Sequence, residues 1–131
     1  MESFNCGERV VVVDDDPSVR MSLEMLLEEA GFLVAAYASG EEALAGFAIA
    51  SAECLVADVY LGGMTGIELR DKLQDRQQDV PTIFITGRDD SVTRAALQRA
   101  GIMSYLRKPL DPSDFLRTVR RALGSRGKRQ S

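Results

Sequence analysis

The stretch Val10-Val11-Val12-Val13-Asp14-Asp15-Asp16-Pro17 decides how this sequence of 131 residues is expected to fold. Four β-branched apolar residues in a row are typical of a strand buried on both faces, as in a parallel sheet covered by helices. Three adjacent carboxylates end the run, and they repel one another unless water or a cation solvates them. Pro17 stands where a helix would begin. We therefore expect a buried strand that brings acidic side chains to the carboxyl edge of an open α/β sheet.

The three aspartates also have an ordinary structural interpretation. Asp16 precedes Pro17 and is expected to be the N-cap of the helix. Asp14 and Asp15 directly end a buried strand, so turn chemistry explains them less well, and this stretch alone supports the two interpretations equally. If a cation binds them, ligands that are all carboxylate oxygens favour a hard ion such as Mg²⁺ or Ca²⁺.

Composition limits the class of protein. Apolar residues make up 45% of the chain and charged residues 27%, which is typical of one soluble globular domain with a hydrophobic core. No apolar run approaches the roughly 20 residues of a membrane helix. Residues 1–8 lack the basic start and apolar core of a secretory signal, so we expect a cytoplasmic protein without a membrane partner. Two cysteines are too few for a disulfide scaffold or a zinc site, and the absence of histidine excludes histidine-based catalysis, metal ligation and pH sensing.

The net charge of −4 hides an uneven distribution. Residues 1–114 hold 20 acids and 10 bases, whereas residues 115–131 hold 6 bases and no acid. The acidic body argues against direct nucleic-acid binding by this domain. The bases at the end fit a helix terminus that complements the helix dipole and then frays. We expect residues 1–8 to be an N-terminal extension, 9–123 one domain, and 124–131 a disordered tail or the stub of a linker.

Apolar and helical patterns alternate along the chain. Strands are predicted at residues 9–14, 32–37, 53–58, 81–86 and 103–106. Helices are predicted at residues 17–30, 67–76 and 90–100, with a short helix after Ser39 and a last helix that opens at Asp111-Pro112. Glu42 is expected to complete a capping box with Ser39, and Phe47 to lie on the apolar face of that short helix. Five strand–helix pairs predict an α/β fold, a doubly wound (βα)5 parallel sheet with helices on both faces and the flavodoxin-like strand order 2-1-3-4-5.

The carboxyl ends of the predicted strands collect polar side chains. Asp14 and Asp15 end the first strand, Asp58 the third and Thr86 the fourth, and Lys108 follows the fifth. Each has an ordinary role when taken alone, because an aspartate can start a turn, a threonine suits a strand and a lysine is usually a surface charge. The carboxyl ends of parallel strands share one edge, so we expect these side chains to form a single site.

This set of side chains suits phosphoryl transfer. A carboxylate can attack phosphorus as a nucleophile and form an aspartyl phosphate, and Asp58 ends the strand expected at the middle of the sheet. Thr86 could donate a hydrogen bond to one phosphoryl oxygen, and Lys108 supplies a mobile positive charge for another. A divalent cation held by the carboxylates would neutralise charge on the transferred group.

Together these residues resemble the receiver domain of two-component response regulators. The resemblance covers residues 9–123 and rests on Asp14-Asp15, Asp58 followed by Gly63-Met64-Thr65-Gly66, Thr86-Gly87, and Tyr105-Leu106-Arg107-Lys108-Pro109. It implies that Asp58 is the phosphoacceptor, assisted by Thr86 and Lys108. It also implies a Mg²⁺ site, with Mn²⁺ as a substitute, formed by Asp14, Asp15, Asp58 and the backbone carbonyl of Tyr60. The Lys108-Pro109 peptide bond is expected to be cis.

The resemblance further implies a switch and partners. Thr86 is expected to turn toward the phosphoryl group while Tyr105 rotates inward, which would alter the surface formed by residues 90–123. The phosphoryl donor would be the phosphohistidine of a sensor histidine kinase or of a phosphotransfer protein. Phosphorylation could also produce a homodimer through the fourth helix, fifth strand and fifth helix. The opening of residues 13–20 resembles receivers joined to a DNA-binding output domain, so the chain is either a stand-alone receiver or part of a longer regulator.

The chain departs from the family pattern at a few positions. Leu61-Gly62 stand where many members carry Met-Pro, which loosens that loop, and Ile102 replaces a small residue. Tyr60 and Arg88 lie two residues past the phosphoacceptor and two past Thr86, the positions that tune the attacking water in the family. Because both side chains are bulky, we expect them to screen the phosphoryl group and slow its hydrolysis.

Three other functions need comparison with this signalling role, which is not that of a metabolic enzyme. A phosphatase that forms an aspartyl phosphate usually carries a second aspartate where this chain has Tyr60. A flavin phosphate would be repelled by the aspartates at 14–16. A receiver-like docking module that acts without phosphorylation is the main alternative.

Overall fold

Five parallel strands form the centre of the structure, in the order β2-β1-β3-β4-β5. The computed structural model describes residues 7–102 and 104–130, with side chains described as far as residue 124. The strands are β1 (Arg9–Val13), β2 (Leu33–Tyr37), β3 (Cys54–Asp58), β4 (Thr82–Thr86) and β5 (Leu106–Arg107). The helices are α1 (Pro17–Glu29), α2 (Gly40–Ala45), the 3₁₀ helix η1 (Phe47–Ser51), α3 (Gly66–Asp75), α4 (Ser91–Arg99) and α5 (Pro112–Gln130). The predicted α/β class and strand order are confirmed.

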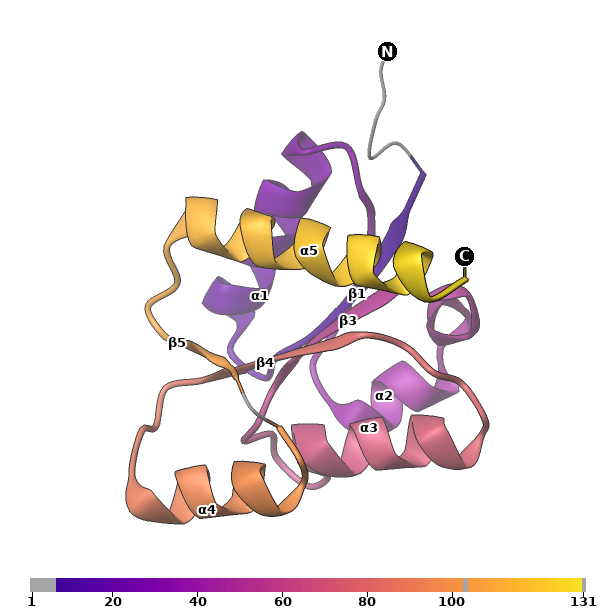
Figure 1. Ribbon diagram of the computed structural model, residues 1–131. Coiled ribbons are helices and arrows are strands. Elements are labelled where there is room, and N and C mark those ends of the chain that lie inside the picture. The colour runs from indigo at the N-terminus through magenta and orange to yellow at the C-terminus, as the bar shows by residue number, and fades with distance from the viewer. Residues whose placement is uncertain (1–6, 103, 131) are drawn as a thin grey trace.

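Helices cover both faces of the sheet (Figure 1). α1 and α5 lie on one face, and α2, α3 and α4 lie on the other. Along β1, Val10 and Val12 pack into the α1/α5 layer, whereas Val11 and Val13 pack into the α2/α3 layer, and all four are fully buried. Burial on both faces explains why this strand is an unbroken apolar run. In the described part of the chain, no helix has the length and apolar character required to cross a bilayer.

Side-chain caps begin the helices where the sequence predicts them. Asp16 accepts a hydrogen bond from the Ser18 N–H, which confirms its role as N-cap of α1. Ser39 accepts a hydrogen bond from the Glu42 N–H at the start of α2. The Glu42 carboxylate accepts from the Ala38 N–H rather than from Ser39, so only half of the predicted capping box forms. These caps satisfy helical N–H groups that have no intrahelical partner.

The second helix ends earlier than the sequence pattern suggests. α2 stops at Ala45, and the extended backbone of Gly46 (φ −82°, ψ 155°) separates it from η1. This break shifts the phase of the residues that follow, so the prediction that Phe47 lies on an apolar face is wrong: its side chain is 99% exposed. Ile49 takes the buried position instead.

The last strand is shorter than predicted. β5 spans Leu106–Arg107, so a strand at 103–106 is wrong for residues 104 and 105, and Met103 lies outside the described residues. β5 lies at the edge of the sheet and pairs only with Ile85 and Thr86 of β4. A short edge strand leaves few open backbone groups for unwanted pairing.

The last helix is longer than predicted. α5 spans Pro112–Gln130, and the division of the chain into a domain at 9–123 and a tail at 124–131 stays a prediction. That the segment serves as a linker stays a prediction, while Ser131 and residues 1–6 of the predicted extension lie outside the described residues.

Gly66 provides a test of how closely α3 approaches the end of β3. A Cβ at Gly66 would collide with the main-chain carbonyl of Asp58, whereas a Cβ at Gly62 meets nothing within 4 Å. We expect Gly66→Ala to lower the free energy of unfolding by ~1–3 kcal/mol through overpacking against backbone. Gly62→Ala is the matched control and should change it by less than about 0.5 kcal/mol. Urea unfolding followed by circular dichroism measures both, and equal stability of the two variants would contradict the close approach.

Candidate functional site

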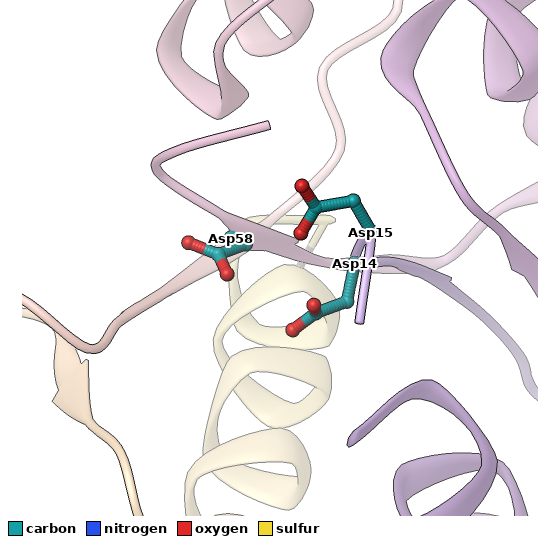
Figure 2. A group of neighbouring side chains, drawn as sticks. All are labelled: Asp14, Asp15 and Asp58. Carbon is teal, nitrogen blue, oxygen red and sulfur yellow. The ribbon is translucent and has the colours of Figure 1, made fainter. Parts of the chain in front are cut away.

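Three carboxylates converge at the carboxyl edge of the sheet (Figure 2). Asp14 follows β1 and Asp58 ends β3, and these two strands are hydrogen-bonded neighbours. One oxygen each from Asp14, Asp15 and Asp58 lies within 4.8 Å of the others. Asp14 and Asp58 are buried, whereas Asp15 is exposed. The cluster therefore reaches the protein surface through Asp15. The predicted convergence of these residues is confirmed.

Lys108 joins the carboxylates from the other side. Its ammonium donates a hydrogen bond of 2.6 Å to Asp58 Oδ2 and lies 3.0 Å from Asp14 Oδ2. The backbone N–H of Lys108 donates to the Thr86 carbonyl (2.9 Å), which fixes the residue just past β5, and the Lys108-Pro109 bond is cis as expected. Burial opposes the charged lysine, but the hydrogen bond to Asp58 and the nearby charge of Asp14 outweigh burial, so the pKa of Lys108 is raised.

Asp14 Oδ2 is a buried oxygen with no hydrogen-bond partner among the described residues. It lies at ion-pair distance from Lys108, but the angle does not make a hydrogen bond. Burial raises the pKa of Asp14, because it outweighs the Asp16 N–H and the Lys108 ammonium, which both lower it. Three carboxylates face one ammonium, so negative charge is in excess. An orphaned carboxylate oxygen in an all-oxygen cluster fits a hard divalent cation such as Mg²⁺.

Hydrogen bonds hold Thr86 to the loop that follows β4. The Thr86 hydroxyl is fully buried, donates to the Arg88 carbonyl (3.2 Å) and accepts from the Arg88 N–H (3.0 Å). Thr86 therefore lies on the strand next to Asp58, but its hydroxyl forms its hydrogen bonds with the loop that follows β4. A residue expected to turn toward a group on Asp58 would first have to give up these two bonds.

Tyr60 and Arg88, the two bulky residues singled out from the sequence, are in contact. The Arg88 guanidinium carbon lies 4.4 Å from the centre of the Tyr60 ring, within the range of a cation–π interaction. The Tyr60 N–H donates to Asp58 Oδ1 (3.0 Å), so this residue orients the carboxylate through its main chain. The predicted role of the Tyr60 carbonyl as a metal ligand stays a prediction.

Asp89 is a residue that sequence reasoning missed. It accepts a hydrogen bond from the Tyr105 hydroxyl (2.8 Å) and forms ion pairs with Arg94 and Arg107, both at 3.2 Å. These bonds hold the predicted switch residue Tyr105 against the β4–α4 loop. The tyrosine bond is the main cause of the lowered pKa of Asp89, and the same bond raises the pKa of Tyr105. One signal was available: α4 needs only Asp90 as its cap, which leaves Asp89 for another role.

Arg20 is a second missed residue. It extends from the first turns of α1, and its Nη1 donates to the main-chain carbonyl of Asp14 (2.8 Å). The bond ties α1 to the loop that carries Asp14 and Asp15. The sequence gives no signal for it, because an arginine at a half-buried helical position resembles any surface residue.

The sequence of this chain is similar to those of known proteins. The family model described as "Response regulator receiver domain" matches residues 10–120. The chain is 33% identical to the C4-dicarboxylate transport transcriptional regulatory protein DctD of Rhizobium meliloti over 91% of its own length and 26% of the relative's. It is 34% identical to the transcriptional regulatory protein FixJ of Azorhizobium caulinodans over 88% of its length and 54% of the relative's. The chain thus spans about a quarter to a half of these curated relatives.

Solved structures agree with the sequence comparison. A response regulator receiver protein from Burkholderia phymatum is 39% identical, with a TM-score of 0.74 over 89% of this chain and 95% of that one. The chemotaxis protein CheY4 of Vibrio cholerae is 29% identical, with a TM-score of 0.79 over 90% of this chain and 100% of that one.

The bond between Tyr105 and Asp89 predicts a change in tyrosine titration. Asp89→Asn removes the charged acceptor, so we expect the pKa of Tyr105 to fall toward its ordinary value of 10.0. Titration of the tyrosine ring carbons by NMR measures this, with the Tyr105 signal assigned from Tyr105→Phe. Asp75→Asn, an exposed carboxylate on α3, is the control and should leave the titration unchanged. An unchanged Tyr105 titration in Asp89→Asn would contradict the contact.

Proposed function

The chain belongs to the response regulator receiver domain family, and from this membership we propose that Asp58 accepts a phosphoryl group from a phosphohistidine. The observation that carries the proposal is that the Lys108 ammonium contacts both Asp58 Oδ2 and the orphaned oxygen of Asp14. Asp58 thus has a cation at one oxygen and two further acids close by. This arrangement suits a nucleophile whose product bears additional negative charge.

The chain's own residues divide the work of the transfer. A carboxylate oxygen of Asp58 attacks phosphorus, the bond from phosphorus to the donor nitrogen breaks, and its electron pair returns to the imidazole of the donor. The Tyr60 N–H keeps one Asp58 oxygen in place, and Lys108 neutralises charge at the other. Lys108 remains protonated at neutral pH because its two acidic partners raise its pKa. It therefore acts as a charge and not as a proton donor.

We assign a Mg²⁺ site, also open to Mn²⁺, to the carboxylates of Asp14, Asp15 and Asp58 with the Tyr60 carbonyl. The unsatisfied Asp14 Oδ2 and the excess of acidic groups support this set. When bound, the ion supplies Lewis-acid stabilisation of charge on phosphoryl oxygens. Arg20 keeps the Asp14 main chain in position for this purpose.

The switch is a local change in hydrogen bonding. A phosphoryl oxygen on Asp58 offers the Thr86 hydroxyl an acceptor that competes with the Arg88 carbonyl. Movement of Thr86 frees the loop around Asp89, and Tyr105 leaves Asp89 to rotate inward. The two bonds bias the unphosphorylated arrangement, and phosphorylation shifts the population. The affected surface is α4, β5 and α5, which could then bind a second copy or an output partner.

The partner that delivers the phosphoryl group is a sensor histidine kinase or a phosphotransfer protein. A largely apolar groove between α1 and the loop after β5 is lined by Val19, Met25, Leu26, Pro109 and Leu110, together with Lys108. A donor domain held in this groove would have its phosphohistidine close to Asp58. The relatives are named as transcriptional regulators, which fits an output through a separate DNA-binding domain rather than through this acidic body.

Incubation with acetyl phosphate tests the phosphoacceptor. We expect a mass increase of one phosphoryl group that requires Mg²⁺ and is absent in Asp58→Asn, because the variant lacks the nucleophile. Asp14→Asn should need a higher Mg²⁺ concentration for the same adduct, and Asp75→Asn is the matched acid-to-amide control that should behave as wild type. Intact mass spectrometry provides the readout. No adduct at saturating donor would make phosphate-independent docking the leading function.

The contact between Tyr60 and Arg88 predicts a slow loss of the phosphoryl group. We expect the double substitution Tyr60→Asn, Arg88→Ala to shorten the half-life of the adduct roughly tenfold, which is about 1.4 kcal/mol, because it opens the site to water. The half-life is followed by intact mass after the donor is removed. A half-life equal to or longer than that of wild type would contradict screening by these side chains.

A further inference from the structure

Thr93 lies in α4, outside the site described above, yet its side chain reaches the loop that follows Asp58. Its hydroxyl oxygen is 2.5 Å from the hydroxyl of Tyr60, a contact between residues 33 positions apart in the sequence. Thr93 is fully buried, although it is one of few polar residues that are. A buried hydroxyl that forms one long-range bond is not explained by helix capping, which needs only its backbone N–H.

Asp90 holds the backbone of Thr93 at the start of α4. The Thr93 N–H donates to Asp90 Oδ1 (2.8 Å), and this bond is the main cause of the lowered pKa of Asp90. The cap therefore fixes the position of Thr93 in the helix, and its hydroxyl shares a hydrogen bond with the Tyr60 hydroxyl.

These bonds hold Tyr60 at three points. Its N–H bonds Asp58, its ring lies against the Arg88 guanidinium, and its hydroxyl bonds Thr93. The first two contacts involve the acidic site and the β4–α4 loop, whereas the third anchors the end of the side chain to α4. Without the third contact, the tip of the side chain would have no hydrogen bond, and the ring would be held only by packing against its apolar cluster and the exposed Arg88.

We propose that Thr93 is a positioning residue that acts through Tyr60 to lengthen the lifetime of a phosphoryl group on Asp58. The inference rests on the proposed function, because it needs a phosphorylated Asp58. Thr93 touches neither Asp58 nor the acidic cluster in any described contact, so it acts only by keeping the tyrosine ring where it excludes water. The lifetime of the signal is thereby set in part by α4, a component of the responsive surface.

The test compares isosteric substitutions on both ends of the bond. Each full-length variant is phosphorylated with acetyl phosphate and Mg²⁺, the donor is removed, and the adduct is followed by intact mass. Thr93→Val and Tyr60→Phe each remove one hydroxyl, and we expect each to shorten the half-life about fivefold, which corresponds to ~1 kcal/mol. Thr93→Ser keeps the hydroxyl and should stay within about twofold of wild type.

The double variant Thr93→Val, Tyr60→Phe separates a shared bond from two independent effects. If the hydroxyls act through one another, the double variant loses no more than either single variant. Additive shortening would overturn the proposal, as would a Thr93→Ser half-life as short as that of Thr93→Val. If the adduct forms and its half-life is equal in wild type and Thr93→Val, the role of Thr93 is overturned but the proposed function is not. If wild type forms no adduct, the proposed function itself is overturned. Tyr60→Phe keeps the test decisive if Thr93→Val fails to fold.

Discussion

The structure depends on one electrostatic constraint, the crowding of Asp14, Asp15 and Asp58 around the single ammonium of Lys108. Two of these carboxylates are buried, and buried charge is unfavourable unless it is paired. The ion pairs with Lys108 compensate for part of this cost, but Asp14 Oδ2 has no hydrogen-bond partner among the described residues. A fold that keeps such a cluster retains a place for added positive charge. The excess of negative charge in this cluster thus favours the binding of a cation.

The site combines a rigid part with a part that can rearrange. Asp14 follows β1 and Asp58 ends β3, two inner strands whose apolar residues are buried, so their main chain cannot move without disturbing the core. The loop between β4 and α4 is different. Side-chain hydrogen bonds hold it, through Thr86, Asp89 and Asp90, and each of these can be exchanged for another partner at modest cost. The carboxylates are therefore held in place by the core, while the loop between β4 and α4 can exchange its hydrogen bonds.

Sequence reasoning identified the parts of the fold that follow from periodicity. The run from Val10 to Val13 and its counterpart ending at Asp58 predicted inner parallel strands, and their ends predicted the acidic site. It failed where a small geometric change decides the outcome, as at Gly46, which moves Phe47 from the expected apolar face into solvent. It also missed Asp89 and Thr93, because residues of these types are common at a helix start and suggest no contact beyond it. Their partners, Tyr105 and Tyr60, come from distant segments that only the folded chain brings near.

The contacts of these two missed residues share a physical principle. Tyr105 is held by Asp89, and Tyr60 is held by Thr93, so in each case a tyrosine hydroxyl shares a hydrogen bond with a residue in the first turn of α4 or just before it. A phenol suits this position because its ring packs as an apolar body while its tip forms one directed bond. The start of α4 is therefore where the orientation of both tyrosines is decided. Both bonds thus depend on the position of that helix end, because Asp89 precedes α4 and Thr93 lies in its first turn.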